Sequence, residues 1–253
     1  MPSQDLLFDG IERFHADARW GRVLDAGTGD HSLGWLRTLP TESLTLVTGA
    51  PARAERLSAS LRPQDRALAG NWEDPTLLHG ERFDVVLADY LLGAVEGFAP
   101  YFQDRLLGRL RRHVGGRLYF VGMEPLPDAA PDAGGQAILE MARLRDACIL
   151  LAQHRCYREY PQQWVVRKLQ ESGYRVLDSW ELPIVYRASK INRQLDVAQS
   201  KLRFFRDPEL AQAMAAHIAE LRERACILAE TSGGIRLGSD YVIAAELQPG
   251  VRP

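Results

Sequence analysis

Residues 23–33, Val23-Leu24-Asp25-Ala26-Gly27-Thr28-Gly29-Asp30-His31-Ser32-Leu33, decide how the rest of the chain is interpreted. They predict a short buried strand, a turn with two glycines and the start of a helix. Such a turn brings backbone N–H groups and a helix N-terminus close to a ligand. Glycine at 27 and 29 removes the Cβ atoms that would block close approach and permits a positive φ. Asp25 ends the strand, where its carboxylate suits an ammonium group or a ribose hydroxyl and would repel a pyrophosphate.

A turn of this kind occurs in many α/β proteins, but Leu24-Asp25-Ala26-Gly27-Thr28-Gly29 resembles the first motif of class I S-adenosylmethionine-dependent methyltransferases. About 60 residues later, Phe83-Asp84-Val85-Val86 leads to Asp89-Tyr90 and resembles the fourth motif of that family. The apolar run that leads from Phe83 to Asp89 is typical of a central strand in a parallel sheet covered on both faces. The resemblance implies methyl transfer with S-adenosyl-L-methionine as the cofactor.

The order of predicted elements matches the same family. Strands are predicted at residues 22–26, 44–48, 66–70, 82–90, 114–122, 174–180 and 239–247. Helices are predicted at 5–19, 30–39, 51–61, from Pro75, 97–112, 136–160 and 161–173. We expect an α/β fold with a doubly wound, seven-stranded, mostly parallel, Rossmann-like sheet and an antiparallel last strand.

We expect one methyltransferase domain over residues 1–253. Its core would comprise residues 20–183 and 237–248, with a helical cap at 184–236. The cap is predicted because roughly 50 residues separate the sixth and seventh strands, where a hairpin needs only a few. Its two apolar stripes are Ile191, Leu195, Ala198, Leu202 and Phe205, and then Leu210, Met214, Ile218 and Leu221.

The resemblance places the cofactor site at Asp25, Ala26, Gly27, Thr28, Gly29, Thr48, Asn71, Trp72, Glu73 and Asp89. Asp25 would face the cofactor's ammonium group or fix the loop through water. Thr48 stands where the family commonly has an acidic ribose ligand and is a poorer acceptor. Together with Ser32 in place of glycine, it argues against a nicotinamide enzyme. One of residues 71–73 would contact the adenine, and the sequence does not indicate which one. Alternatively, these residues form a capped loop.

Asp89 and Tyr90 are the predicted catalytic residues, because a strand end and a motif coincide there. Asp89 would accept a proton or hold an acceptor amine, and Tyr90 would wall the pocket. Alternatively, Asp89 only caps the following turn. A pairing of Asp89 with Glu96 is faintly similar to the carboxylate pair of protein arginine methyltransferases, although the spacing differs. His31 is expected to cap or pack, and no metal is expected.

Two groups are candidates for binding the acceptor. Tyr157, Tyr160 and Trp164, together with His154, form either core packing or an aromatic wall. Arg193 and Lys201 belong to residues 187–206, which hold six basic residues against one acid. That run is either a solvated helix face or a site for a carboxylate or phosphate.

Composition restricts the setting. The chain has 253 residues, 46% of them hydrophobic and 25% charged, and a net charge of −2, which makes nucleic acid an unexpected partner. Cys148, Cys156 and Cys226 have no C-x-x-C spacing and are expected to be reduced thiols in the cytoplasm. The start of the chain shows no secretory signal, and no apolar run approaches the ~18 residues that span a bilayer, so no membrane partner is expected.

These features predict a methyltransferase for a small molecule, anionic or aromatic, with oxygen or nitrogen as the methyl acceptor. Whether the chain forms a homodimer is left open by the sequence. The alternatives are a protein of this fold that binds cofactor or a partner without catalysis, and an RNA- or protein-directed methyltransferase.

Overall fold

The computed structural model describes residues 6–249. Residues 1–5, on which the lack of a secretory signal rests, lie outside the described residues. The strands are β1 (Arg22–Asp25), β2 (Ser43–Thr48), β3 (Arg66–Ala69), β4 (Phe83–Asp89), β5 (Val114–Met123), β6 (Tyr174–Tyr186) and β7 (Ile235–Leu247). The α-helices are α1 (Leu6–His15), α2 (Asp30–Leu36), α3 (Pro51–Ser58), α4 (Leu91–Ala94), α5 (Gln103–Leu110), α6 (Ala133–Leu151), α7 (Gln162–Glu171), α8 (Ala188–Lys201) and α9 (Pro208–Thr231). Short 3-10 helices are η1 (Val95–Gly97), η2 (Arg111–His113) and η3 (Leu202–Phe204).

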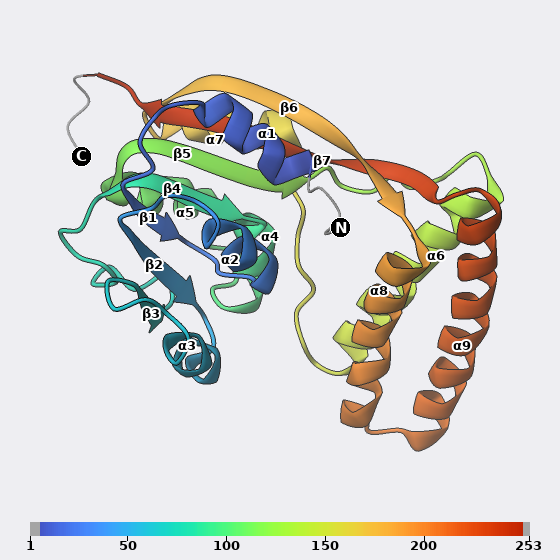
Figure 1. Ribbon diagram of the computed structural model, residues 1–253. Coiled ribbons are helices and arrows are strands. Elements are labelled where there is room, and N and C mark those ends of the chain that lie inside the picture. Colours follow the sequence, from blue (N-terminus) through green and yellow to red (C-terminus); the bar gives the residue numbers. More distant parts are fainter. Residues whose placement is uncertain (1–5, 250–253) are drawn as a thin grey trace. The chain divides into compact units, whose positions relative to one another are not determined.

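The seven strands form one sheet in the order β3-β2-β1-β4-β5-β7-β6 (Figure 1). β1 pairs in parallel with β2 on one side and with β4 on the other. β7 runs antiparallel to β5, with Met123 opposite Asp240. The chain builds outward from β1 to β3 and then returns to β4 on the other side of β1. The strand order therefore reverses between β1 and β4, where ligands of such sheets bind at the carboxyl ends. The predicted fold is confirmed.

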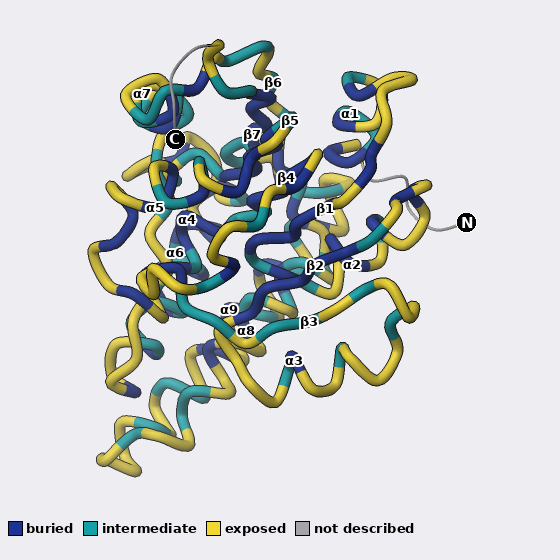
Figure 2. Tube along the Cα trace, turned by 90° about the vertical axis from the view of Figure 1, so that its left-hand side faces the viewer, coloured by how far each residue is buried: buried dark blue, intermediate teal, exposed yellow. Residues whose placement is uncertain are grey.

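Apolar side chains from the central strands pack on both faces of the sheet. Leu24 and Val86 point into the cluster that α4, α5 and α7 cover. Val23 and Val85 point into the opposite cluster, which α1 and α2 cover. Figure 2 shows β1 and β4 buried along most of their length. Because side chains alternate between faces, a strand covered on both sides needs an unbroken apolar run.

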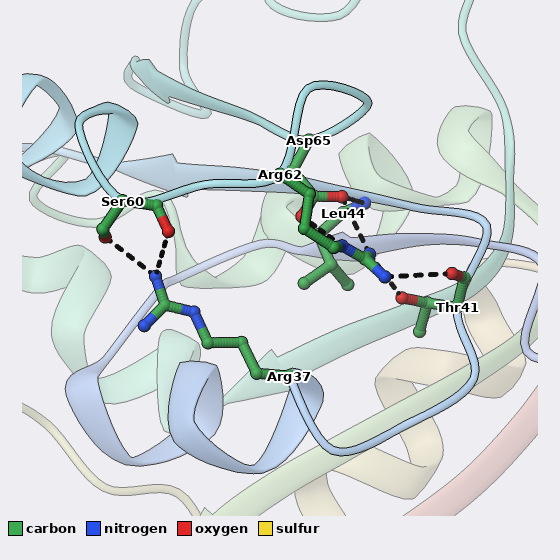
Figure 3. A network of polar contacts seen from close by, with 6 residues as sticks. All are labelled: Arg37, Thr41, Leu44, Ser60, Arg62 and Asp65. Carbon is green, nitrogen blue, oxygen red and sulfur yellow. Dashed lines mark hydrogen bonds and ion pairs between the residues drawn. The ribbon is translucent and has the colours of Figure 1, made fainter.

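Polar contacts close the opposite, amino-terminal end of β2 (Figure 3). Asp65 accepts from the Leu44 N–H at 2.8 Å and from Arg62 at 2.7 Å, and Arg62 donates to Thr41 Oγ1 at 2.8 Å. Arg37 reaches Ser60 Oγ at 2.9 Å. These contacts hold the loops at the end of the sheet away from the two motifs.

Two predicted helices are wrong in position. The helix predicted over 97–112 is replaced by η1, a turn and α5, because Pro100 has no N–H and Tyr101 adopts a φ of 67°. No helix starts at Pro75. There, Asp74 accepts from the Thr76 N–H at 2.8 Å, a local bond that competes with helix formation.

The long helix predicted over 136–160 is wrong at both ends. It starts earlier, at Ala133, because Asp132 caps it by accepting from the Gly135 N–H at 2.7 Å. It ends at Leu151, and Gln153 follows with a left-handed φ of 59°. Residues 153–160 follow the helix without regular secondary structure.

The chain divides into two compact units. The sheet unit comprises Met1–Glu124, Tyr157–Leu182 and Asp240–Pro253, and the helical unit comprises Pro125–Cys156 and Pro183–Ser239. The helical unit thus contains the expected insertion and also α6, which the sequence placed with the core. Within it, α6, α8 and α9 pack side by side (Figure 1). Their contacts bury most of the two predicted stripes, namely Ile191, Leu195, Ala198, Ile218 and Leu221.

Candidate functional site

Asp25 is fully buried at the end of β1 and holds the glycine turn from within. Its Oδ2 accepts from Ser32 Oγ at 2.9 Å, and its Oδ1 lies 3.4 Å from the Gly27 N. Ser32 Oγ in turn accepts from the Gly29 N–H at 3.1 Å. Burial raises the pKa of Asp25 to about 6, since the hydrogen bonds from Ser32, Gly27 and Thr28 offset only part of the desolvation. The carboxylate therefore fixes the loop directly, and Ser32 is a site residue that the motif did not indicate.

The two glycines of the turn have different roles. Neither has a positive φ, so that reason for glycine is wrong here. A Cβ on Gly27 would lie 2.9 Å from Leu91 Cδ1, so this glycine lets the start of α4 pack against the turn. A Cβ on Gly29 would lie 3.7 Å from Ser32 Oγ, which is ordinary van der Waals contact. Gly29 leaves the side of the turn open to a ligand.

Trp72 supports the turn from behind. Its ring is 3% exposed, and its Nε1–H donates to the Ala26 carbonyl at 2.6 Å. The Arg109 guanidinium lies over the ring, 5.8 Å from its centre. The buried ring therefore contacts the glycine turn through the backbone of Ala26.

Asn71 and Thr48 form the neighbouring strand ends. Asn71 donates to the Phe98 carbonyl at 2.8 Å and accepts from the Glu73 N–H at 3.0 Å, while Glu73 is exposed. The Phe98 ring packs so closely on Gly49, directly after β2, that no Cβ fits there. Thr48 is buried and accepts from the Ala50 N–H at 3.3 Å. Phe98 was missed because its position follows from the turn that replaces the predicted helix.

Tyr90 follows β4 in a left-handed conformation, with φ 47° and ψ 21°. Such a backbone costs a residue with a Cβ roughly 1–2 kcal/mol. Its N–H donates to the Val121 carbonyl at 3.0 Å, which ties it to β5. Its hydroxyl donates to Asp240. The pKa of Tyr90 lies well above its usual value because of burial, the charge and hydrogen bond of Asp240, and the charges of Asp89 and Glu159.

Several carboxylates gather around this strand end. Burial and the charges of Asp240, Asp89 and Glu159 raise the pKa of Tyr90. Burial and the charges of Glu124 and Glu159 raise the pKa of Tyr241. Asp240 could have been anticipated, since an antiparallel last strand starts at the carboxyl edge of β5. Glu159 comes from the irregular segment before α7, and no local pattern marks it.

Glu96 is already engaged elsewhere. It is buried and accepts from Gln103 Nε2 at 2.8 Å and from the Tyr101 N–H at 3.3 Å. These bonds hold the turn before α5. The faint pairing of Asp89 with Glu96 therefore gains no support from its contacts.

The aromatic candidates in the sheet unit are partly packing residues. The ring centres of Tyr160 and Trp164 lie 4.5 Å apart, and both rings pack against the core. The Tyr160 carbonyl accepts from the Tyr241 hydroxyl at 2.8 Å. Tyr157 is exposed. His31 is exposed, with its ring 5.0 Å from that of Phe8.

The remaining candidates belong to the helical unit. His154 Nδ1 lies 3.2 Å from Lys201 Nζ, and the ring centres of His154 and Phe204 lie 4.9 Å apart. Arg193 is exposed on α8. The substrate-binding roles of Arg193 and Lys201 stay predictions.

Among residues 6–249, no group of three or more histidine, cysteine or acidic side chains is arranged to hold a metal ion. In the same part of the chain, no helix combines the length and the apolar character required to cross a bilayer.

No protein-family model matches the chain, and no curated protein sequence matches it significantly. Solved structures do share its fold. The methyltransferase candidate BH2331 from Bacillus halodurans C-125 is 13% identical, with a TM-score of 0.58, over 94% of this chain and 97% of that one. The [4+2]-cyclase SpnF is 16% identical, with a TM-score of 0.56, over 96% and 81%.

The mycolic acid cyclopropane synthase CmaA1, solved with SAH and CTAB, is 16% identical, with a TM-score of 0.55, over 94% of this chain and 84% of that one. At these identities the likeness concerns the fold. It agrees with the strand order and with the antiparallel pairing of β5 and β7. The chain therefore has the α/β fold of class I methyltransferases.

Proposed function

We propose that the protein is an S-adenosyl-L-methionine-dependent methyltransferase acting on a small molecule. The observation that carries this proposal is the pair of strand ends at the point where the strand order reverses. β1 ends in a turn that Asp25 and Ser32 hold open on the Gly29 side. The adjacent β4 ends in the strained residue Tyr90, beside Asp89. Unfavourable backbone conformations of this kind concentrate at functional sites.

The donor side is formed by the glycine turn. The backbone around Gly29 would receive the methionine part of the cofactor, because no side chain fills the space there. Thr48 would lie toward the ribose and Asn71 toward the adenine. When bound, the cofactor supplies an electrophilic methyl group on a sulfonium. The chain would orient the acceptor in line with this methyl group and exclude water.

The acceptor side is formed by Asp89 and Tyr90. Their acidic surroundings favour nitrogen over oxygen as the acceptor atom, because an amine nitrogen becomes positively charged as it attacks the methyl group, and carboxylates stabilise that charge. Asp89 would then take the proton that the nitrogen loses. An oxygen acceptor remains an alternative. Tyr157, Tyr160 and Trp164 would contact an aromatic acceptor. The three free cysteines support a reducing, cytoplasmic setting.

The donor side is tested by calorimetric titration with S-adenosylmethionine. Gly29→Ala is expected to lower the affinity at least tenfold, because the new methyl group enters the open side of the turn. Gly34→Ala is the matched control, since a Cβ there meets no atom within 4 Å. Equal affinities for the wild type and Gly29→Ala would remove the turn from the cofactor site.

The reaction is tested by incubating the protein with methyl-labelled cofactor and a metabolite extract. A labelled small product, identified by its mass, is the expected result. Asp89→Asn is expected to lower the turnover at least tenfold while the affinity for the cofactor changes little. Label in RNA or protein instead would identify a macromolecular acceptor.

The alternative is a protein that binds the cofactor without transferring its methyl group. Thr48 favours this alternative, because it replaces the acidic residue that commonly binds the ribose. Tight cofactor binding without label in any fraction would decide for it.

A further inference from the structure

The connection between α8 and α9 carries exposed apolar side chains at one end of the helical unit. Val197, Phe204 and Leu210 are 39%, 44% and 38% exposed. They fall within 14 residues, hereafter the hairpin tip (residues 197–210). Single exposed apolar residues are ordinary, but a group of them in one connection marks an interaction surface.

Basic residues outnumber acidic ones in α8 and the hairpin tip, since residues 187–210 contain six basic and three acidic side chains. Residues 187–206, from the N-cap of α8 to the segment after it, contain six basic residues. Among the described residues, none of these six forms an ion pair with a carboxylate: Arg187, Lys190, Arg193, Lys201, Arg203 and Arg206. The one acid within residues 187–206, Asp196, pairs instead with Arg222 of α9 at 2.9 Å. Asp207 accepts from the first N–H groups of α9 at 2.9 and 3.2 Å. The positive charge of this segment is therefore available to a partner.

The basic and apolar groups lie on a common face. At ~100° per residue, Lys190, Arg193, Val197 and Lys201 fall on one side of α8, away from its buried stripe. Phe204 continues this face in η3, where the Arg203 guanidinium lies 4.7 Å from the centre of its ring.

We propose that the hairpin tip docks on the surface of an anionic lipid bilayer. Phe204 would enter the interface, where aromatic rings are favoured, and Lys201, Arg203 and Arg206 would contact lipid phosphates. A second copy of this chain is a poor occupant, because residues 187–210 of two copies carry an excess of positive charge and repel each other. This proposal concerns binding to the bilayer surface and requires no segment that spans the membrane.

The test is co-sedimentation of the full chain with vesicles. Neutral phosphatidylcholine vesicles are compared with vesicles containing about 30% phosphatidylglycerol, at about 0.1 M and 0.5 M salt. We expect binding to the anionic vesicles only, weakened at high salt. Arg203→Gln with Arg206→Gln should weaken it about 30-fold, from the usual contribution of a basic residue near such a surface. Phe204→Ser should weaken it about fivefold.

The matched control is Arg56→Gln with Arg105→Gln, which removes the same charge from exposed positions of the sheet unit. It should leave vesicle binding unchanged. Binding to neither vesicle, or an equal loss in this control, would overturn the proposal. Analytical ultracentrifugation tests whether a second copy of the chain binds the hairpin tip. A dimer that Phe204→Ser dissociates, together with no binding to vesicles, would also overturn the proposal. Thermal unfolding of each variant verifies that the chain is folded, and the Arg203/Arg206 variant tests the proposal without loss of the Phe204 ring.

Discussion

Asp25 offers the sharpest test of the site, because its carboxylate is fully buried without a cationic hydrogen-bond partner. Its pKa rises from 3.8 to about 6 on folding, chiefly by desolvation. At 1.36 kcal/mol per pH unit, this rise costs the folded state about 3 kcal/mol once the group is ionised. Between pH 4 and 6 the unfolded chain binds fewer protons than the folded chain. The contribution of Asp25 to stability is therefore fully present below pH 3.8 and is lost as the pH rises through 6.

We predict that Asp25→Asn is more stable than the wild type at neutral pH. The amide keeps a carbonyl oxygen for Ser32 but turns its NH₂ group toward the Gly27 N–H, which costs about 1 kcal/mol. The net gain at pH 7.5 is then about 2 kcal/mol. Between pH 5 and pH 7.5 the advantage of the variant should grow by about 1.5 kcal/mol.

The assay is urea unfolding of the cofactor-free protein at both pH values, with linear extrapolation of the free energy of unfolding. Ser32→Ala serves as the comparison. It removes the donor at 2.9 Å from the carboxylate and should lower the free energy of unfolding by about 1–3 kcal/mol at pH 7.5. An Asp25→Asn variant that is less stable than the wild type at both pH values by the same amount would refute the reasoning.

Three further substitutions test the surroundings of the site. Gly27→Ala should lower the free energy of unfolding by about 1–3 kcal/mol in urea, because the added Cβ overpacks the start of α4; an unchanged midpoint would contradict the packing role. Trp72→Phe leaves the buried Ala26 carbonyl without its donor and should cost about 1–3 kcal/mol, measured by thermal unfolding, and full stability would show that the bond is dispensable. Tyr90→Phe removes the hydroxyl that donates to a carboxylate and should cost about 1.5–3 kcal/mol by calorimetry, whereas a gain would show that relief of desolvation dominates.

Much of the fold followed from local patterns. Unbroken apolar runs at β1 and β4 predicted strands covered on both faces, and the observed sheet has them at its centre. The helix predicted over 97–112 failed at Pro100, where a missing N–H and the φ of Tyr101 outweighed the apolar spacing. A proline is a local signal of such a break, and the spacing of apolar residues alone does not show it.

The donor side of the site was more predictable than the acceptor side. Local chain geometry determines the glycine turn, because Asp25, Gly29 and Ser32 lie within eight residues of one another. By contrast, Phe98 lies against Gly49, and Glu159 lies beside Gly93, because of how distant segments return to the sheet.

The sequence by itself determined the order of the elements along the chain, the two-glycine turn after β1 and the acidic end of β4, since each depends on residues close together in the chain. Only the tertiary structure decided that Tyr90 donates to Asp240. The physical reason is the antiparallel return of β7, which pairs Asp240 with Met123 and so carries a remote carboxylate to the same edge of the sheet.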